Sequence, residues 1–164
     1  MIILNANNFL FKGKLDEQFY LSNNITDIKL NEKVFKKIIN QDGDCPALFT
    51  YIYDKILYEI TVLENVIIGI STQFNNNYKM KLLVEGYEGV IFKIKVKASL
   101  LKFTDFLNCN NYSWEIDKVN SSNKTFAVKI NSLTTLMYSL EKGKEGFFQI
   151  ASFDRALYDK LRNV

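Results

Sequence analysis

Residues 49–60, FTYIYDKILYEI, decide the fold that we expect for this chain. Apolar or aromatic side chains occupy every second position on both sides of Asp54-Lys55, which is typical of two strands joined by a two-residue turn. Folding the stretch at that turn pairs Tyr53 with Ile56, Tyr51 with Tyr58, and Phe49 with Ile60. A slip of one residue would turn all six side chains to the other face of the sheet. The stretch therefore predicts a β-hairpin with a fixed register.

The same argument predicts one further strand and two further hairpins. A strand over roughly residues 66–72 continues the meander after a turn at Glu64-Asn65. A turn from Glu85 to Gly89 is expected to pair Val84 with Val90, Leu82 with Phe92, and Met80 with Ile94. A turn over 119–123 is expected to pair Ile116 with Phe126 and Trp114 with Val128. These segments predict an antiparallel sheet system built from consecutive hairpins.

Four segments carry helical spacing instead, namely 31–41, 99–108, 132–142 and 152–162. Each begins at a residue that can cap a helix: Asn31, Ser99, Ser132 and Ser152. The clearest of them is 132–142, where Leu133, Leu136, Met137 and Leu140 share one helical face and Gly143 follows the last turn. We therefore expect an α+β fold with about four short helices packed on one side of the sheet.

Composition fits a single domain that spans residues 1–164. The chain is 48% hydrophobic and 24% charged, which is enough apolar material for a core without staples. One proline and seven glycines leave little room for a flexible linker. The apolar run in residues 1–10 is too short for a membrane span or a signal peptide. Cys45 and Cys109 lie outside any CxxC pattern, so we expect a reducing cytoplasm, while their pairing stays open.

The 79–97 segment predicts one unusual surface. Its expected register sets Lys81 opposite Lys93 and Lys79 opposite Lys95 on the outward side. Like charges directly opposite each other destabilise a sheet, so this surface needs an explanation. We call it the lysine face, and it comprises Lys79, Lys81, Lys93, Lys95 and Lys97 with Leu83 and Ile91 among them. It predicts either a solvated, aggregation-resistant sheet face or a site that binds an acidic protein or a phosphate backbone.

Catalytic and metal-binding motifs are missing from the sequence. The chain has no histidine, which removes Ser-His and Cys-His pairs and the usual zinc sites. No Walker loop, GxGxxG or GxSxG motif occurs. Asp42-Gly43-Asp44 reads as a turn rather than a cation site, and the acids Glu85 and Glu88 read as turn residues rather than a catalytic pair. The sequence predicts no catalytic residue, no metal ligand and no cofactor.

These observations favour a non-enzymatic protein-binding protein. A stoichiometric inhibitor, such as a bacterial toxin-immunity protein or a phage anti-defence protein, needs a rigid scaffold and a complementary surface rather than a reaction centre. The net charge of +3 makes an acidic or apolar partner surface the expected one, with no membrane involved. One alternative is a nucleic-acid-binding accessory protein, although only two of the 21 basic residues are arginines. A second alternative is a histidine-independent enzyme, and the oligomeric state stays open.

Overall fold

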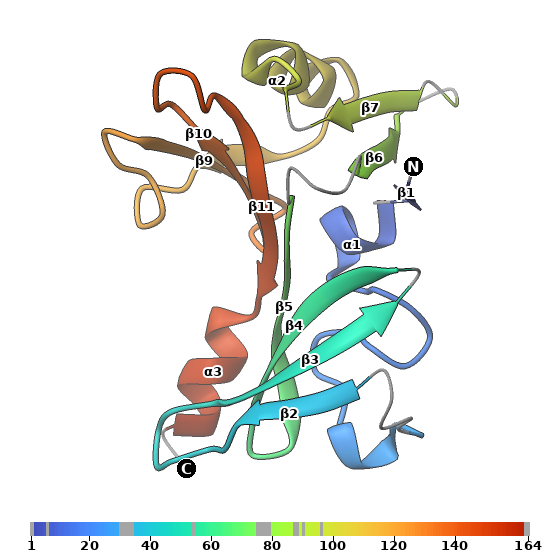
Figure 1. Cartoon of the computed structure of the whole chain (residues 1–164), viewed down its shortest axis with the longest axis vertical. Helices are drawn as coiled ribbons and strands as arrows, with labels where there is room; N and C mark the ends of the chain where they lie inside the picture. The colour runs from blue at the N-terminus through green and yellow to red at the C-terminus, as the bar shows by residue number, and fades with distance from the viewer. Residues whose placement is uncertain are drawn as a thin grey trace. The chain divides into compact units, whose positions relative to one another are not determined.

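The computed structural model describes residues 2–5, 7–29, 35–53, 55–74, 80–86, 89, 91–95 and 97–162 (Figure 1). The chain forms two compact units. The first unit holds Met1–Lys12 and Gln73–Ile150, and the second holds Gly13–Thr72 and Ala151–Val164. The expectation of a single domain stays a prediction.

The second unit is built on an antiparallel meander. Its strands are β2 (Phe35–Ile39), β3 (Ala47–Tyr53), β4 (Ile56–Leu63) and β5 (Val66–Gln73), hydrogen-bonded in that order and followed by the last residues of β11 (Gly146–Phe153). The predicted pairs Tyr53–Ile56, Tyr51–Tyr58 and Phe49–Ile60 are all confirmed. The predicted turn at Glu64-Asn65 is also confirmed, because both residues adopt positive φ angles, 49° and 63°, as a type I′ turn requires.

An aromatic cluster fills the inner face of this meander. Tyr58 and Ile60 of β4 are fully buried. The Phe19 ring, from the loop before a short 3-10 helix (Ile25–Asp27), stacks on Tyr51 with ring centroids 4.0 Å apart. The rings of Phe35 and Phe49 stack in the same way at 4.9 Å. These contacts explain why β2 is a strand, since Phe35 can reach this cluster from a position opposite Tyr51.

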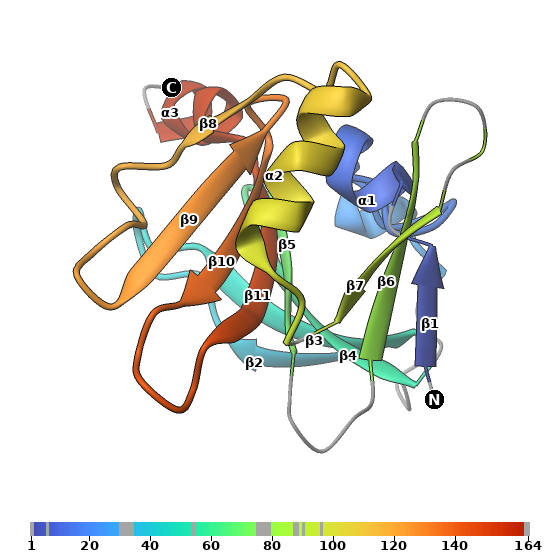
Figure 2. The same cartoon turned by 90° about the horizontal axis from the view of Figure 1, so that it is seen from above.

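The first unit contains two sheets. The smaller one has the order β1-β6-β7, with β1 (Ile2–Asn5) parallel to β6 (Met80–Glu85) and β7 (Ile91–Lys95) antiparallel to β6 (Figure 2). The other continues from β11 through β10 (Thr134–Ser139) and β9 (Thr125–Ile130) to β8 (Trp114–Ile116). Helix α1 spans Asn7–Lys12 and helix α2 spans Leu100–Cys109. The core lies between these elements and includes Phe9, Leu10, Val84, Ile94, Phe103, Val128, Leu136 and Phe147.

The helix expected over 132–142 is wrong, because the segment forms strand β10. Asn131 and Ser132 adopt φ angles of 49° and 61°, and the Leu133 amide donates to the Ile130 carbonyl over 3.2 Å. Two successive residues with positive φ closed by this bond make a type I′ turn, which joins two strands and cannot begin a helix. Strand β10 then pairs back along β9, with Leu136 opposite Val128.

The other helix predictions have mixed outcomes. The helix over 99–108 is confirmed as α2, with the Ser99 side chain accepting from the Lys102 amide. The helix over 31–41 is wrong for its described part, which is strand β2, while Asn31 lies outside the described residues. The helix over 152–162 is confirmed only as α3 (Arg155–Arg162), because Ser152 ends up inside β11 and the Asp154 carboxylate caps the Leu157 amide. The described residues therefore form a mostly antiparallel, strand-rich structure with three α-helices.

The β8–β9 register differs from the prediction by two residues. Trp114 lies opposite Ile130 and Ile116 opposite Val128. The cause is Asp117, whose amide donates to the Ala127 carbonyl and whose carboxylate accepts from the amides of Val119 and Asn120. Burial acts to raise the pKa of Asp117, but hydrogen bonds from Asn120, Thr135 and these amides outweigh it and lower the pKa. The loop between β8 and β9 is consequently longer than the alternation of the two strands suggests.

Tyr51 offers a test of the aromatic cluster. Its hydroxyl donates to the Asp16 carboxylate over 3.1 Å, and burial together with the charge of Asp16 raises the pKa of Tyr51 to about 12. A raised folded-state pKa means that this stabilisation is complete below about pH 10, the ordinary tyrosine value, and is lost as the pH rises toward 12. Tyr51→Phe should therefore lose less stability across this window than the wild type, as measured by urea unfolding at a series of pH values. Equal losses would contradict the Tyr51–Asp16 contact.

Candidate functional site

The β6–β7 hairpin has one buried and one outward face. Val84 and Ile94 point inward and are fully buried. Phe92, on the same inward side, contacts the rings of Phe103 and Phe106 on α2, with centroids 5.9 and 4.9 Å apart. Because side chains alternate along a strand, the residues between these positions must face outward. Those outward positions carry the predicted lysine face.

The predicted register of this hairpin is wrong by two residues. Lys81 lies opposite Lys95 rather than Lys93, and Leu83 lies opposite Lys93. Glu85 pairs with Ile91, so the last described pair of the hairpin lies one residue further along β6 and one further along the chain in β7 than the predicted Val84–Val90 pair. A shift of two does not move a residue to the other face of a strand, so exposed Lys93 and Ile91 share the outward side of β7 as predicted. Lys79 lies outside the described residues, and only the backbone of Lys81 and Lys95 is described.

An uncovered apolar pair lies among these positions. Ile91 is 54% exposed and Leu83 is half-buried. They occupy diagonal positions on neighbouring strands, because Leu83 is opposite Lys93 and Glu85 is opposite Ile91. Lys93 and Glu85 are both exposed. This part of the lysine face thus combines two aliphatic side chains with charged neighbours.

Tyr112 anchors the turn end of the hairpin, and sequence reasoning missed it. Its hydroxyl donates to the Glu85 carbonyl over 2.9 Å, and its ring lies 6.2 Å from that of Phe106. Burial, followed by the charge of Glu85, raises the pKa of Tyr112. Tyr112 follows α2 in the chain. Its hydrogen bond therefore links the C-terminal end of β6 to the helix that packs against the hairpin. The sequence carries no local signal for this long-range contact.

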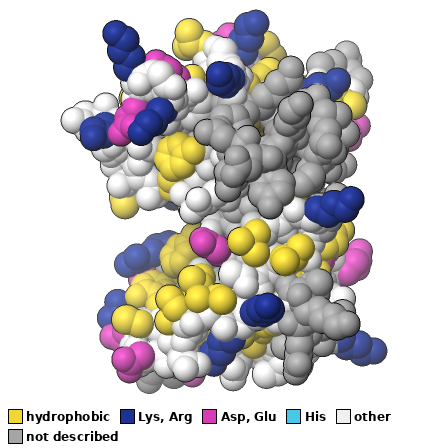
Figure 3. Space-filling view, in the orientation of Figure 1, with side chains coloured by type: hydrophobic (Ala, Val, Ile, Leu, Met, Phe, Trp, Pro, Cys, Tyr) yellow, Lys and Arg dark blue, Asp and Glu magenta, His cyan; other side chains and the backbone are white. Residues whose placement is uncertain are grey.

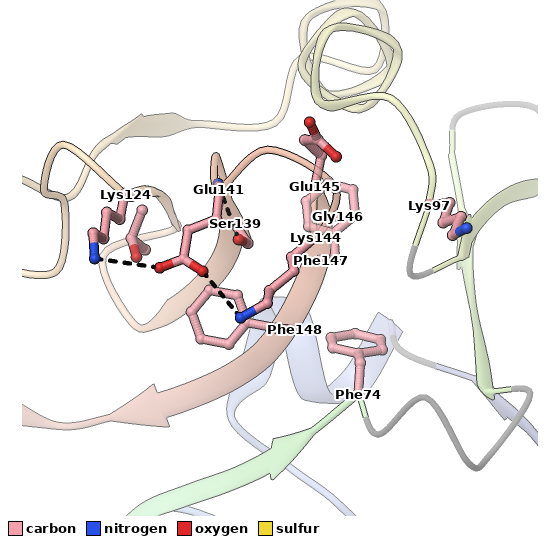
Figure 4. A pocket seen from close by; sticks show the side chains of 12 residues that line it. Phe74, Lys97, Lys124, Ser139, Glu141, Lys144, Glu145, Gly146, Phe147 and Phe148 are labelled. Carbon is pink, nitrogen blue, oxygen red and sulfur yellow. Dashed lines mark hydrogen bonds and ion pairs between the residues drawn. The ribbon is translucent and has the colours of Figure 1, made fainter.

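Lys97, the last member of the lysine face, lies at a pocket. It is exposed, and it lines a pocket of about 670 Å³ together with residues from the start of β9, the β10–β11 turn and the start of β11. Figure 4 shows Lys97 on the side of this pocket away from Lys124 and Lys144. The floor includes Phe74, whose amide donates to the Phe148 carbonyl over 2.7 Å. Sequence reasoning did not bring these residues together.

The charges of the pocket are paired with each other. The Glu141 carboxylate lies 3.6 Å from the Lys124 ammonium and 3.5 Å from that of Lys144 (Figure 4). Backbone hydrogen bonds from Glu145 itself and from Gly143, with a smaller influence of Lys97, lower the pKa of Glu145. Such exposed pairs stabilise weakly and leave few free cations for an anionic ligand. The ion pairs of Glu141 with Lys124 and Lys144 therefore help to hold the β10–β11 turn in place.

The weaker sequence candidates lie elsewhere. Asp42 and Cys45 exchange backbone hydrogen bonds of 3.1 and 2.9 Å, so this segment forms a tight turn, and Asp44 pairs with Arg162 at 2.7 Å. Glu88 lies outside the described residues. Within the described ranges, no group of three acids or cysteines is arranged to hold a metal ion. Cys45 and Cys109 are both exposed and unpaired.

Comparisons with protein-family models, with curated proteins and with solved structures found no match to this chain. Among the helices that the structure describes, none has both the length and the apolar character needed to cross a membrane.

Replacing Tyr112 tests the anchoring of the hairpin. Tyr112→Phe removes the hydrogen bond to Glu85 and should lower the free energy of unfolding by about 0.5–1.5 kcal/mol. Amide hydrogen exchange in β6 should become faster in the same variant. The control is Tyr20→Phe, since Tyr20 is 37% exposed and lies in the other unit, and exchange in β6 should not change. Unchanged exchange in Tyr112→Phe would contradict the anchor.

Proposed function

We propose that this chain is a non-enzymatic protein-binding protein that acts as a stoichiometric inhibitor through the lysine face. The observation that carries the proposal is the exposure of Ile91 beside half-buried Leu83, among charged side chains of the β6–β7 hairpin. Inhibitors of this kind include bacterial toxin-immunity proteins and phage anti-defence proteins. The two unpaired cysteines support a reducing cytoplasm as the place where it works.

An aliphatic patch with a charged rim is the usual anatomy of a protein interface. The centre of an interface loses water and is apolar, whereas its rim stays polar and hydrated. Ile91 and Leu83 fit the centre, because each would release apolar surface from water on binding. Lys93 fits the rim, where a long ammonium side chain stays solvated and steers the encounter. Contact with water alone does not require the aliphatic side chains of Leu83 and Ile91 at these positions.

The charge of the face selects the partner. The backbone register places Lys81 opposite Lys95 and Lys93 opposite Leu83, so lysines outnumber acids at the described outward positions. The exposed Lys93 ammonium favours an acidic partner surface over a basic one. Phosphate would satisfy the lysines as well, but it would leave the aliphatic pair exposed to water. We therefore favour an acidic, partly apolar protein surface over nucleic acid.

The proposal is tested by capture followed by affinity measurement. Tagged wild-type protein should retain one stoichiometric acidic partner from nuclease-treated lysate of its host, and that partner should lose activity in the complex. Ile91→Asp and Lys93→Glu should each weaken binding of the purified partner at least about tenfold. Lys118→Glu, an exposed lysine in the loop after β8, is the matched charge control and should leave the affinity within about twofold.

Three results would overturn the proposal. Equal affinity of Ile91→Asp and wild type would show that the lysine face is not the binding surface. Retention of nucleic acid alone, with a steep loss of binding as salt rises, would support the nucleic-acid alternative. Turnover of a small molecule lost in Glu141→Gln would support an enzyme that uses the pocket.

A further inference from the structure

The outer face of the second unit carries a second uncovered apolar pair. Ile52 of β3 lies directly opposite Leu57 of β4, and the two are 47% and 54% exposed. They face away from Tyr58 and Ile60, which are fully buried on the inner side of the same strands. Over β2–β4, Figure 3 shows hydrophobic, basic and acidic side chains close together on the surface. We call the surface made by Lys36, Thr50, Ile52, Leu57 and Glu59 the outer face.

The chain itself covers the other end of these strands. Gly69 of β5 lies opposite Thr61, and a Cβ added at Gly69 would come within 2.9 Å of the Phe153 ring. Phe153 ends β11 and leads into α3, which is held in turn by the ion pair between Arg162 and Asp44. Side chains from β11 therefore protect the Gly69 end, while Ile52 and Leu57 at the opposite end remain in contact with water.

A row of three residues next to this pair carries opposite charges. Lys36 of β2 lies opposite Thr50 of β3, which lies opposite Glu59 of β4. Lys36 is exposed, and Glu59 is half-buried and accepts a hydrogen bond from Ser71 over 3.2 Å. Their backbones are about 9.5 Å apart, twice the strand spacing, with Thr50 midway between them. The cation and the anion are thus symmetrically placed about β3.

We propose that a second copy of this chain docks on the outer face, with a two-fold axis that runs along β3 above Thr50. Rotation about that axis places β2 over β4 of the second copy at the same height. Lys36 then meets Glu59 of the partner subunit, and Glu59 meets Lys36 of the partner subunit. Ile52 meets Ile52 of the partner subunit beside Leu57, so the apolar pair is buried. The contact uses one patch on both copies, as a closed dimer requires.

The charge pattern argues against a two-fold axis that runs across the strands. A two-fold axis across the strands would set Lys36 over its own copy and Glu59 over its own copy, opposing like charges at both positions. The same balance disfavours a strongly charged partner, because any such surface would repel either Lys36 or Glu59. A second copy with the axis along β3 satisfies both charges, which is why we commit to it.

The size of the outer face sets the strength of the dimer. Three strands and five residues cover about 14 Å by about 16 Å. This is well below the roughly 800 Å² that each partner contributes to a standard interface, so the dimer is a weak one. Association should be detectable by sedimentation equilibrium between about 10 µM and about 1 mM of the full chain, with a dissociation constant inside that range.

Charge reversal gives the decisive test. Lys36→Glu and Glu59→Lys should each be monomeric up to about 1 mM, since each alone creates two like-charge contacts across the axis. An equimolar mixture of the two variants should form a heterodimer at least as readily as the wild type, because both contacts are then attractive. Leu57→Asp should weaken association at least about tenfold. The control is Val119→Asp, a 92% exposed loop residue of the first unit, which should behave as wild type.

The outcomes separate cleanly. A wild-type protein that is monomeric at about 1 mM overturns the proposal. A dimer that persists in Lys36→Glu, or a mixture that fails to restore association, overturns the proposed axis and face. Loss of partner binding by the lysine face would not affect these results, because none of the variants touches β6 or β7.

Discussion

Burial of alternate side chains along paired strands is the constraint on which both proposed surfaces depend. On β3 and β4 the burial of Tyr58 and Ile60 leaves Ile52 and Leu57 no position except the outer face. On β6 and β7 the burial of Val84 and Ile94 forces Ile91 outward in the same way. In both places, burial of one face of the strands leaves aliphatic side chains of the other face in contact with water.

The alternation also explains how much of the sheet could be predicted from sequence. Period two fixes which face a side chain occupies, and these assignments hold for the described residues of all three predicted hairpins. It does not fix the register, which depends on both the length and the position of the turn. The turn closed by Lys55, with its φ of 66°, has the expected two-residue length, so the β3–β4 register was predictable. The β6–β7 turn keeps five residues but lies one residue later, and hydrogen bonds of Asp117 hold the β8–β9 loop, so both registers differ from the prediction by two residues.

Helices were harder to predict because apolar spacing is ambiguous over short segments. Leu133, Leu136 and Met137 match a helical face, but the positive φ angles of Asn131 and Ser132 close a hairpin first. Phe35 fits a helical stripe, yet its ring is more strongly stabilised in the aromatic cluster opposite Tyr51. Helix α2 was predictable because its cap, its apolar face and its packing against Phe92 all agree. The pocket around Glu141 joins segments far apart in the chain, so the sequence gives no sign of it.

Solvent access to Ile91 tests most directly whether the lysine face is an open surface. The Ile91 and Ile94 methyl groups belong to the same strand, are separated by three positions and should differ sharply in exposure. NMR spectra of isotope-labelled protein, recorded with a soluble gadolinium chelate, report that difference for each methyl group. The structure predicts strong broadening of the Ile91 signal and protection of Ile94. Equal protection of both would contradict the account, because it would place Ile91 under another part of the chain and remove the apolar centre of the proposed interface.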